Sequence, residues 1–402
     1  MTESKLFQKG LGLKSQVKAP LQKDYRGRIV DLARANGYRL HAGDVTIQLA
    51  REFGFCYGVD RAVEYAYEAR ARFPERNIYI TGEIIHNPFV NQRLREMEIR
   101  FLSGPYGTHE KFRPVTAGDV VLLPAFGVST AEMDILKDRG CVLVDTTCGS
   151  VLNVWKNVER YARNGVTSIV HGKYWHEETM ATVSRAAQFP DGHYLVVRDM
   201  EQAKEVCDYI VHGGDPAVFL RAFDSAYSPN FDPDRHLQRL GLANQTTMLS
   251  SDSLAIEDEL RKAMIRRYGA AELTERFSSF DTICSATQER QDAVIQMTRE
   301  RVDLMLVLGG YNSSNTTHLA EISSQHCPTY HISDSECLVS PHEIRHKPVH
   351  GEQEITTHRW LPEGPLTVGV TAGASTPDVK VDESIERLIS FRGLSLSELK
   401  AG

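Results

Sequence analysis

The sequence lacks the signatures of several common protein classes. No apolar run approaches the roughly 20 residues needed to span a bilayer, and the N-terminus has no hydrophobic signal-peptide core. The nucleotide-binding patterns G-x-G-x-x-G (after a strand) and G-x-x-x-x-G-K-[ST] are missing, as are H-E-x-x-H and C-x-x-C. These absences remove the motif support for a membrane protein, for a nicotinamide or nucleotide enzyme, and for a common zinc site.

Cysteine is sparse, with seven residues in a chain of 402. An odd number of cysteines in a long chain does not suggest a secreted disulfide framework, so a reducing compartment fits best. Hydrophobic residues make up 41% of the chain and charged residues 25%. That balance indicates a soluble globular protein with enough core for two or three domains.

The charge of the chain is low overall but unevenly distributed. A net charge of −7 gives no general argument for nucleic-acid binding. Residues 1–40 hold nine Lys or Arg against three acidic residues, a net charge of +6, which leaves −13 for the rest. We expect a helix over residues 24–36, begun by Asp24 and ended by Gly37. We interpret residues 1–44 as a basic N-terminal arm that docks on the acidic body.

One local pattern occurs three times. Cys56, Cys148 and Cys284 each follow a short β-like stretch and precede a helical pattern of apolar residues. Each thiol should therefore lie at a strand-to-helix turn near a helix N-terminus, where the helix dipole favours the metal-ligating thiolate. The other four cysteines lack this context, and we interpret them as structural: Cys141, Cys207, Cys327 and Cys337.

A second strand, ending in polar residues, comes about thirty residues after each of these cysteines. A βαβ unit has this length, and ligands bind outside the carboxyl ends of its strands. We therefore expect each cysteine turn to share a sheet edge with its polar loop. Third strands are expected near residues 120–123, 242–249 and 366–370. The paired positions are Cys56 with His86, Cys148 with His176, and Cys284 with Ser313.

Three converging thiolates would suit an iron–sulfur cluster better than zinc. Structural zinc takes four protein ligands, and catalytic zinc usually includes histidine. A [4Fe–4S] cluster held by only three thiolates keeps one iron open for a substrate. The polar residues at the strand ends would then face the cluster: His86, His176, Glu178, Thr246, Asn315 and Ser375.

Two polar segments admit more than one interpretation. Residues 309–315 read Gly-Gly-Tyr-Asn-Ser-Ser-Asn before a helical pattern, which suits a phosphate at a helix N-terminus but also a plain turn. Residues 340–365 carry several prolines and four histidines. We interpret this second segment as a solvated surface loop, because proline interrupts any single helix and the segment contains no cysteine.

Taken together, the motifs resemble the 4-hydroxy-3-methylbut-2-enyl diphosphate reductase family, in its cyanobacterial and plant branch. They follow the family order and cover nearly all of the chain after the arm. The matching segments are 54–62 (Gly-Phe-Cys-x-Gly-Val-Asp-Arg-Ala), 85–87, 147–148, 245–247, 284–291, 312–315 and 371–377.

The resemblance implies three similar α/β domains, at residues 45–147, 148–283 and 284–402, in a trefoil-like arrangement with pseudo-threefold symmetry around a central cluster. It implies that Cys56, Cys148 and Cys284 ligate one [4Fe–4S] cluster with one open iron. The implied reaction is the reductive dehydroxylation of (E)-4-hydroxy-3-methylbut-2-enyl diphosphate to isopentenyl and dimethylallyl diphosphate.

The resemblance also implies roles for individual residues. Thr246 and His176 would lie near the substrate hydroxyl. Glu178 would donate the proton, with Glu177 as a live alternative because this chain reads His-Glu-Glu where many members have His-x-Glu. Phe126 stands where many members have a diphosphate-binding histidine. The diphosphate would be held by His86, Ser313, Ser314, Asn315 and Ser375.

As electron donor, the resemblance implies reduced ferredoxin or flavodoxin. A cyanobacterial cytoplasm is the favoured location, or the plastid stroma in a plant. No nucleic-acid or membrane partner is expected, and a homodimer is one option. Two rival classes stay open: a non-redox iron–sulfur hydro-lyase, and a cluster-bearing sensor or RNA-binding protein supported only by the basic arm. Consumption of reductant with isoprenoid diphosphate products separates a reductase from both.

Overall fold

The protein is represented by a computed structural model that describes residues 5–102, 111–224, 226–280 and 283–401. The chain divides into two compact units, each built from two segments. The first unit holds residues 1–8 and 109–284, and the second holds residues 9–108 and 285–402. In the described part of the chain, no helix has the length and apolar character required to cross a membrane.

The first unit contains two groups of parallel strands. One group has the order β1 (Leu6–Phe7), β7 (Val142–Asp145) and β6 (Val120–Leu123), with α5 (Thr130–Asp138) between β6 and β7. Every residue of β6 and β7 is buried. Their sequences, Val-Val-Leu-Leu and Val-Leu-Val-Asp, are nearly continuous apolar runs, as expected for parallel strands covered on both faces.

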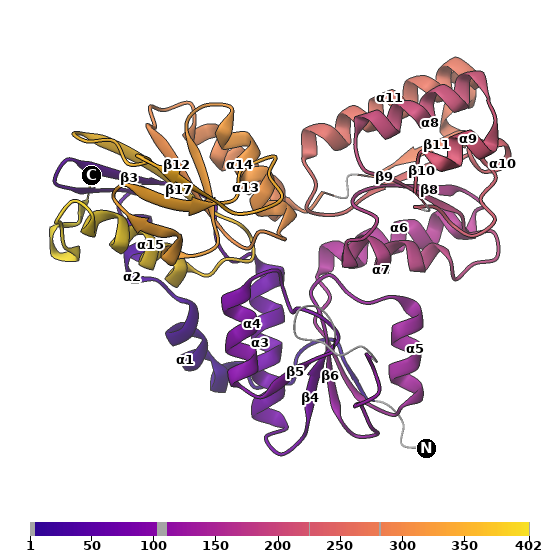
Figure 1. The fold of residues 1–402 in the computed structure, drawn as a ribbon. Helices are drawn as coiled ribbons and strands as arrows, with labels where there is room; N and C mark the ends of the chain where they lie inside the picture. The colour runs from indigo at the N-terminus through magenta and orange to yellow at the C-terminus, as the bar shows by residue number, and fades with distance from the viewer. Residues whose placement is uncertain (1–4, 103–110, 225, 281–282, 402) are drawn as a thin grey trace. The chain divides into compact units, whose positions relative to one another are not determined.

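The other group in the first unit is a four-stranded parallel sheet between two helical layers (Figure 1). Its strand order is β11 (Phe277–Ser279), β10 (Leu240–Asn244), β8 (Thr167–His171) and β9 (Tyr194–Val197). On one face, α8 and α11 pack over Ile169, Leu195 and Leu242; on the other, α6 and α7 cover Ala243. The helices are α6 (Gly149–Arg163), α7 (Glu177–Ala186), α8 (Met200–His212), α9 (Pro216–Arg221), α10 (Pro233–His236), α11 (Ser250–Tyr268) and α12 (Leu273–Arg276).

A six-stranded mixed sheet forms the core of the second unit. Its order is β13 (Thr329–Ile332), β12 (Leu304–Leu308), β17 (Leu366–Ala372), β3 (Val45–Leu49), β2 (Arg39–Ala42) and β18 (Lys400–Ala401). The first four strands are parallel, and β2 and β18 continue the sheet antiparallel. Helices α13 (Ser285–Met297) and α14 (Ser314–Ser324) pack on one face, and α2 (Arg28–Ala35) and α15 (Asp378–Ser390) on the other.

The second unit also contains a smaller group of elements from residues 9–108. Helix α1 packs on α3, and α4 packs on β5. The strands β4 and β5 pair in parallel. The bounds of these elements are α1 (Lys14–Tyr25), α3 (Tyr57–Arg72), β4 (Ile78–Ile80), α4 (Pro88–Glu96) and β5 (Ile99–Phe101).

The interpretation of residues 340–365 as a solvated loop is wrong in part. They contribute to an antiparallel sheet of β14 (Leu338–Ser340), β15 (Glu343–His346) and β16 (Ile355–His358). His346 is buried, and its Nε2 lies 2.8 Å from Thr357 Oγ1. Trp360 donates its indole N–H to Ser340 O at 2.9 Å. The turn-forming residues of this segment predicted a loop. The strands are instead stabilised by pairing with one another, β14 with β15 and β15 with β16, which the local sequence does not indicate.

The single helix expected over residues 24–36 is two helices. Helix α1 ends at Tyr25, and α2 begins at Arg28 after Gly27. Asp24 is not a helix cap; it accepts hydrogen bonds from Tyr67 and Arg93. The amide groups at the start of α2 are instead capped by a carboxylate from far along the chain.

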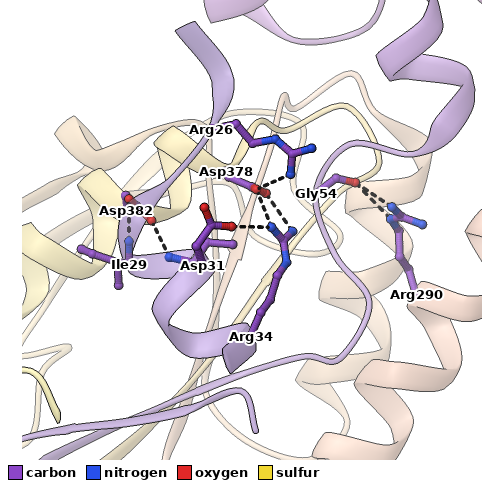
Figure 2. Close-up of polar contacts among 9 residues, drawn as sticks. Arg26, Ile29, Asp31, Arg34, Gly54, Arg290, Asp378 and Asp382 are labelled. Carbon is purple, nitrogen blue, oxygen red and sulfur yellow. Dashed lines mark hydrogen bonds and ion pairs between the residues drawn. The ribbon is translucent and has the colours of Figure 1, made fainter. Parts of the chain in front are cut away.

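That carboxylate belongs to Asp382 on α15 (Figure 2). Its two oxygens accept the N–H groups of Ile29 and Val30, each at 2.9 Å. Beside it, Arg34 forms a forked ion pair with Asp378, at 2.7 and 3.2 Å. Helix α2 thus contacts two acidic side chains of α15, and the segment that follows α2 supplies the sheet strand β2. That residues 1–44 form a separate arm stays a prediction.

The expectation that each cysteine turn and its polar loop belong to one βαβ unit is wrong. The strand before Cys148, β7, pairs with β6, whereas the strand after it, β8, pairs with β9 and β10. The strands before and after Cys56, β3 and β4, also belong to different sheets. The offset of about thirty residues thus marks a crossover from one sheet to another. The third strands do pair with those before the cysteines, although β10 lies at 240–244 and not 242–249.

The fold class is confirmed as α/β with several parallel sheets, which agrees with three similar α/β domains. The boundaries at residues 45, 148 and 284 stay a prediction. Strand β3 (Val45–Leu49) lies in the sheet formed by residues 304–372, because its neighbour is β17.

Candidate active site

The three repeated cysteines all lie at helix N-termini. Cys56 caps α3 and its sulfur accepts the N–H of Val59 at 3.4 Å. Cys148 is the N-cap residue of α6, and Cys284 directly precedes Ser285, the first residue of α13. All three side chains are of intermediate burial. A helix N-terminus stabilises a thiolate, so this donor set fits an iron–sulfur cluster.

The remaining four cysteines differ in their surroundings. Burial raises the pKa of the Cys207 thiol to about 12, and it also raises the pKa values of Cys141 and Cys327. A thiol with a raised pKa stays protonated at neutral pH and is a poor metal ligand. Cys337 is buried, with Ser333 Oγ at 3.4 Å from its sulfur.

The same backbone hydrogen bond anchors each cysteine turn. The amide of Cys148 donates to Ala125 O at 2.8 Å. The amides of Cys56 and Cys284 donate to Ala374 O and Thr246 O, at 3.2 and 3.3 Å. Each acceptor stands two residues beyond the end of the neighbouring parallel strand, which is β6, β17 or β10 respectively. Each thiol is therefore fixed at the carboxyl edge of its sheet, where α/β proteins bind ligands.

A buried carboxylate lies beside one of these anchors in the first unit. Glu178, 3% exposed in the first turn of α7, accepts the N–H of Thr246 at 2.6 Å and its hydroxyl at 3.0 Å. The carbonyl of Thr246 in turn accepts the amide of Cys284. Glu177 is exposed on the same helix. Glu178 is thus joined to a cysteine turn through Thr246.

His176 is the N-cap residue of α7. Its Nδ1 accepts the N–H of Glu178 at 3.1 Å, which leaves the proton of the neutral ring on Nε2. The ring meets that of Phe126 edge to face, with centroids 6.2 Å apart and planes at 72°. Phe126 is buried just beyond the end of β6. The aromatic side chain at position 126 therefore packs against a predicted site residue.

The contacts of Gln245, in the Gln-Thr-Thr motif, could not be predicted from the sequence. Its Oε1 accepts the hydroxyl of Thr179 at 3.2 Å and the amide of Lys173 at 3.1 Å. Its Nε2 donates to Thr247 Oγ1 at 2.9 Å. Gln245 thus holds the loop before α7 against the loop after β10. The Gln-Thr-Thr motif marked the position, but only the fold shows these partners.

The second unit brings together the residues predicted to hold the diphosphate. The hydroxyl of Ser375 donates to His86 O at 3.3 Å, and Glu83 Oε2 lies 3.0 Å from His86 Nδ1. A Cβ atom on Gly310 would lie 2.6 Å from the same carbonyl of His86. The loops that contain His86, Gly310 and Ser375 are therefore closely packed, and position 310 has no room for a side chain.

The N-terminus of α14 points to an anion in this region. Ser313 caps the helix, accepting the N–H of Thr316 at 3.3 Å, and Ser314 is its first residue. Asn315 is 2% exposed and its Oδ1 accepts the N–H of Ala374 at 2.9 Å. Within the described residues its Nδ2 has no acceptor. A buried donor without an acceptor, at a helix N-terminus, suits a phosphate oxygen.

The structure therefore groups the predicted residues by unit. The first unit joins His176, Glu178, Thr246 and Cys284 through direct hydrogen bonds. The second unit joins Cys56 and Asn315 through Ala374, whose carbonyl accepts the amide of Cys56 and whose N–H donates to Asn315 Oδ1.

Fold and site together define a class: an α/β protein with three anchored cysteine turns, a buried carboxylate and a helix N-terminus suited to phosphate. The family model named "LytB protein" matches residues 47–389. Relatives from Thermosynechococcus vestitus and Gloeobacter violaceus, both named 4-hydroxy-3-methylbut-2-enyl diphosphate reductase, are 50% and 51% identical over 388 and 401 residues. These alignments cover 96% and 99% of this chain and 95% of each relative. The chain belongs to the LytB protein family.

Two solved structures are similar. One, of (E)-4-hydroxy-3-methyl-but-2-enyl diphosphate reductase, the terminal enzyme of the non-mevalonate pathway, is 26% identical with a TM-score of 0.51, covering 86% of this chain and 99% of that one. The other, of the E-1-hydroxy-2-methyl-but-2-enyl-4-diphosphate reductase from Plasmodium falciparum, is 22% identical with a TM-score of 0.62, covering 84% and 86%. The second shows the fold alone. The resemblance inferred from the motifs is confirmed.

Proposed function

We propose that this protein is an iron–sulfur reductase that converts (E)-4-hydroxy-3-methylbut-2-enyl diphosphate into isopentenyl and dimethylallyl diphosphate. The observation that carries the proposal is the identical anchoring of Cys56, Cys148 and Cys284 at the carboxyl edges of parallel strands. It occurs in a chain that shares half of its residues with proteins named as this reductase.

The three cysteines would hold a [4Fe–4S] cluster, one per chain. When bound, the cluster would supply electrons and a Lewis-acidic iron without a thiolate ligand. The helix N-termini at the three turns stabilise the thiolates, and the backbone bonds to Ala125, Thr246 and Ala374 fix where each sulfur lies.

The diphosphate would be bound by residues of the second unit. The helix dipole of α14 and the N–H groups at its first turn attract the anion. Asn315 Nδ2 and the hydroxyl groups of Ser313, Ser314 and Ser375 supply further donors, and His86 adds an imidazole. Phe126 cannot donate a hydrogen bond, so its role is to pack against His176 and exclude water.

Proton delivery would fall to Glu178 through Thr246. The reaction takes up two electrons and two protons, breaks the allylic C–O bond and releases the hydroxyl as water. A protonated Glu178 can pass its proton to Thr246 Oγ1 while that hydroxyl gives its own proton to the leaving oxygen, because the two side chains are 3.0 Å apart. His176, whose Nε2 carries a proton, would orient the substrate hydroxyl.

As electron donor we assign reduced ferredoxin, with flavodoxin as the substitute, because a cluster accepts one electron at a time. The cyanobacterial relatives support a cyanobacterial cytoplasm as the location. The homodimer stays a prediction, which sedimentation measurements test.

The proposal is tested by anaerobic purification, iron and sulfide analysis, and assay with the hydroxylated diphosphate and a one-electron reductant. We expect four irons per chain and consumption of reductant matched to product. Water addition or loss without reductant would indicate a hydro-lyase instead. Serine in place of Cys56, Cys148 or Cys284 should abolish the chromophore and the turnover, whereas alanine at the buried Cys207 should cost only packing energy. Full iron content and turnover in Cys148→Ser would overturn the three-ligand assignment.

A further inference from the structure

Arg290 is a buried cation that contacts only the backbone among the described residues for which contacts are given. It lies on α13, is 3% exposed, and stands six residues after Cys284 in the chain. Its Nε and Nη2 both donate to Gly54 O, at 3.2 and 2.8 Å (Figure 2). Its Nη1 donates to Ala286 O at 2.8 Å. The planar guanidinium thus joins the first turn of α13 to the segment that leads into Cys56.

Gly54, whose carbonyl accepts these bonds, has a backbone conformation that favours glycine. Its φ of +74° lies in the left-handed region, and its N–H donates to Ala372 O at 3.2 Å. A Cβ atom there would lie 3.1 Å from Asp378 Oδ1. Asp378 is itself fixed by the forked ion pair with Arg34 (Figure 2). The turn two residues before Cys56 is therefore clamped between Arg290 and Asp378.

The acceptors that Arg290 contacts, Gly54 O and Ala286 O, are uncharged backbone carbonyls. No carboxylate of the described residues forms an ion pair with it. Burying a cation without an anionic partner is strongly unfavourable, so such groups are normally paired or lie beside a bound anion. A [4Fe–4S] centre with three thiolate ligands carries a net negative charge and would meet this need.

We propose that Arg290 is a positioning residue and counter-charge for the cluster: it fixes the Cys56 turn through Gly54 and compensates the negative charge of the bound centre. This inference rests on the proposed function in one respect, that a cluster binds at Cys56. A nearby fixed cation favours the reduced, more negative form of the cluster, so Arg290 also raises its reduction potential.

The test compares Arg290→Lys and Arg290→Gln with the wild type, all purified anaerobically. Arg70→Gln is the matched control, because Arg70 also donates only to backbone carbonyls, including Met97 O and Glu98 O. It lies thirteen residues beyond the start of α3, about 20 Å from the Cys56 turn. The readouts are iron per chain, the rate of iron loss to a chelator, the midpoint potential and the electron paramagnetic resonance spectrum of the reduced cluster.

We expect Arg290→Gln to lose iron roughly tenfold faster, because the loss of one charge-assisted hydrogen bond has an effect of about that size. Its midpoint potential should be lower than that of the wild type. Arg290→Lys keeps the charge without the fork, so it should recover much of the potential but little of the retention. Arg70→Gln should match the wild type in both. Equal potentials and iron loss in Arg290→Gln and the wild type would overturn the inference.

If Arg290→Gln does not fold, Arg290→Lys provides the test. A spectrum and an iron-loss rate of Arg290→Lys that are identical to those of the wild type would exclude a positioning role for the forked guanidinium. The two proposals fail in different ways. A wild-type protein that binds the cluster but does not reduce the diphosphate would overturn the proposed function alone. A wild type without any cluster would overturn both.

Discussion

Thr246 and Glu178 are joined by two hydrogen bonds, one to each carboxylate oxygen. The amide of Thr246 donates to Oε1 at 2.6 Å and its hydroxyl to Oε2 at 3.0 Å. Because the carbonyl of Thr246 accepts the amide of Cys284, the carboxylate is held at a fixed place relative to a cysteine turn. A proton donor needs such fixed geometry, because it must lie within hydrogen-bond distance of its acceptor before its acidity can matter.

The first prediction concerns Glu178→Gln, which keeps the shape of the side chain and an acceptor for the Thr246 amide, and whose Nε2 can donate to Thr246 Oγ1, but which has no acidic proton. Positioned general acids contribute about 10²–10⁴-fold, so turnover should fall on that scale while substrate binding persists. Single-turnover assays and substrate-induced spectral changes separate the two. Glu177→Gln is the control, because Glu177 is exposed, and a larger loss there would reverse the assignment.

A second prediction concerns Phe126, whose ring packs edge to face on His176. Phe126→His should be tolerated and should give KM a new pH dependence near the imidazole pKa of about 6.5, because a protonated histidine can donate to the diphosphate. Phe126→Leu preserves an apolar side chain without a titrating group and should leave the pH profile unchanged. Identical profiles for the wild type and Phe126→His would mean that position 126 does not face the diphosphate.

The third prediction is a pH dependence of stability. Burial lowers the pKa of His331 to about 4, and its Nε2 lies 3.0 Å from Gly309 O in the predicted phosphate loop. As the pH falls from about 6.5, the unfolded chain gains a proton that the folded chain rejects until about pH 4, so stability is lost across that window. The loss should reach about 3 kcal/mol.

His331→Gln tests this, because glutamine keeps an N–H donor for Gly309 O but does not titrate. Anaerobic urea unfolding between pH 4 and 8 should show a smaller acid loss in the variant than in the wild type. Parallel curves would show that His331 is not protonated differently in the two states.

The fourth prediction concerns the docking of the arm. Asp382→Ala removes the acceptor for the amides of Ile29 and Val30 at the start of α2, which should cost about 0.5–2 kcal/mol, as for other helix caps. Protease cleavage near Gly27 should become faster. Asp31→Ala is the matched control, because its ion pair with Arg34 is exposed and worth little. The assignment fails when both variants are cleaved at the same rate.

The local features of this protein could be predicted from its sequence. Strand periodicity and helix-start chemistry predicted the three cysteine turns, the buried strands near residues 120, 304 and 366, and the helix N-terminus at Ser313. These are readable because each depends on neighbours within one or two turns of chain. The family resemblance then supplied roles for His86, His176 and Glu178 that periodicity could not.

The contacts between distant segments could not be predicted in this way and are known from the fold. Sheet partners depend on hydrogen bonds between strands hundreds of residues apart, so the pairing of β3 with β17, and the crossover after each cysteine, were not visible in local pattern. The same holds for Asp382 as the cap of α2 and for Arg290 at Gly54. In the sequence, Arg290 cannot be distinguished from an arginine on the exposed face of a helix. Its partner is a backbone carbonyl, a group that every residue has, so no sequence pattern marks the contact.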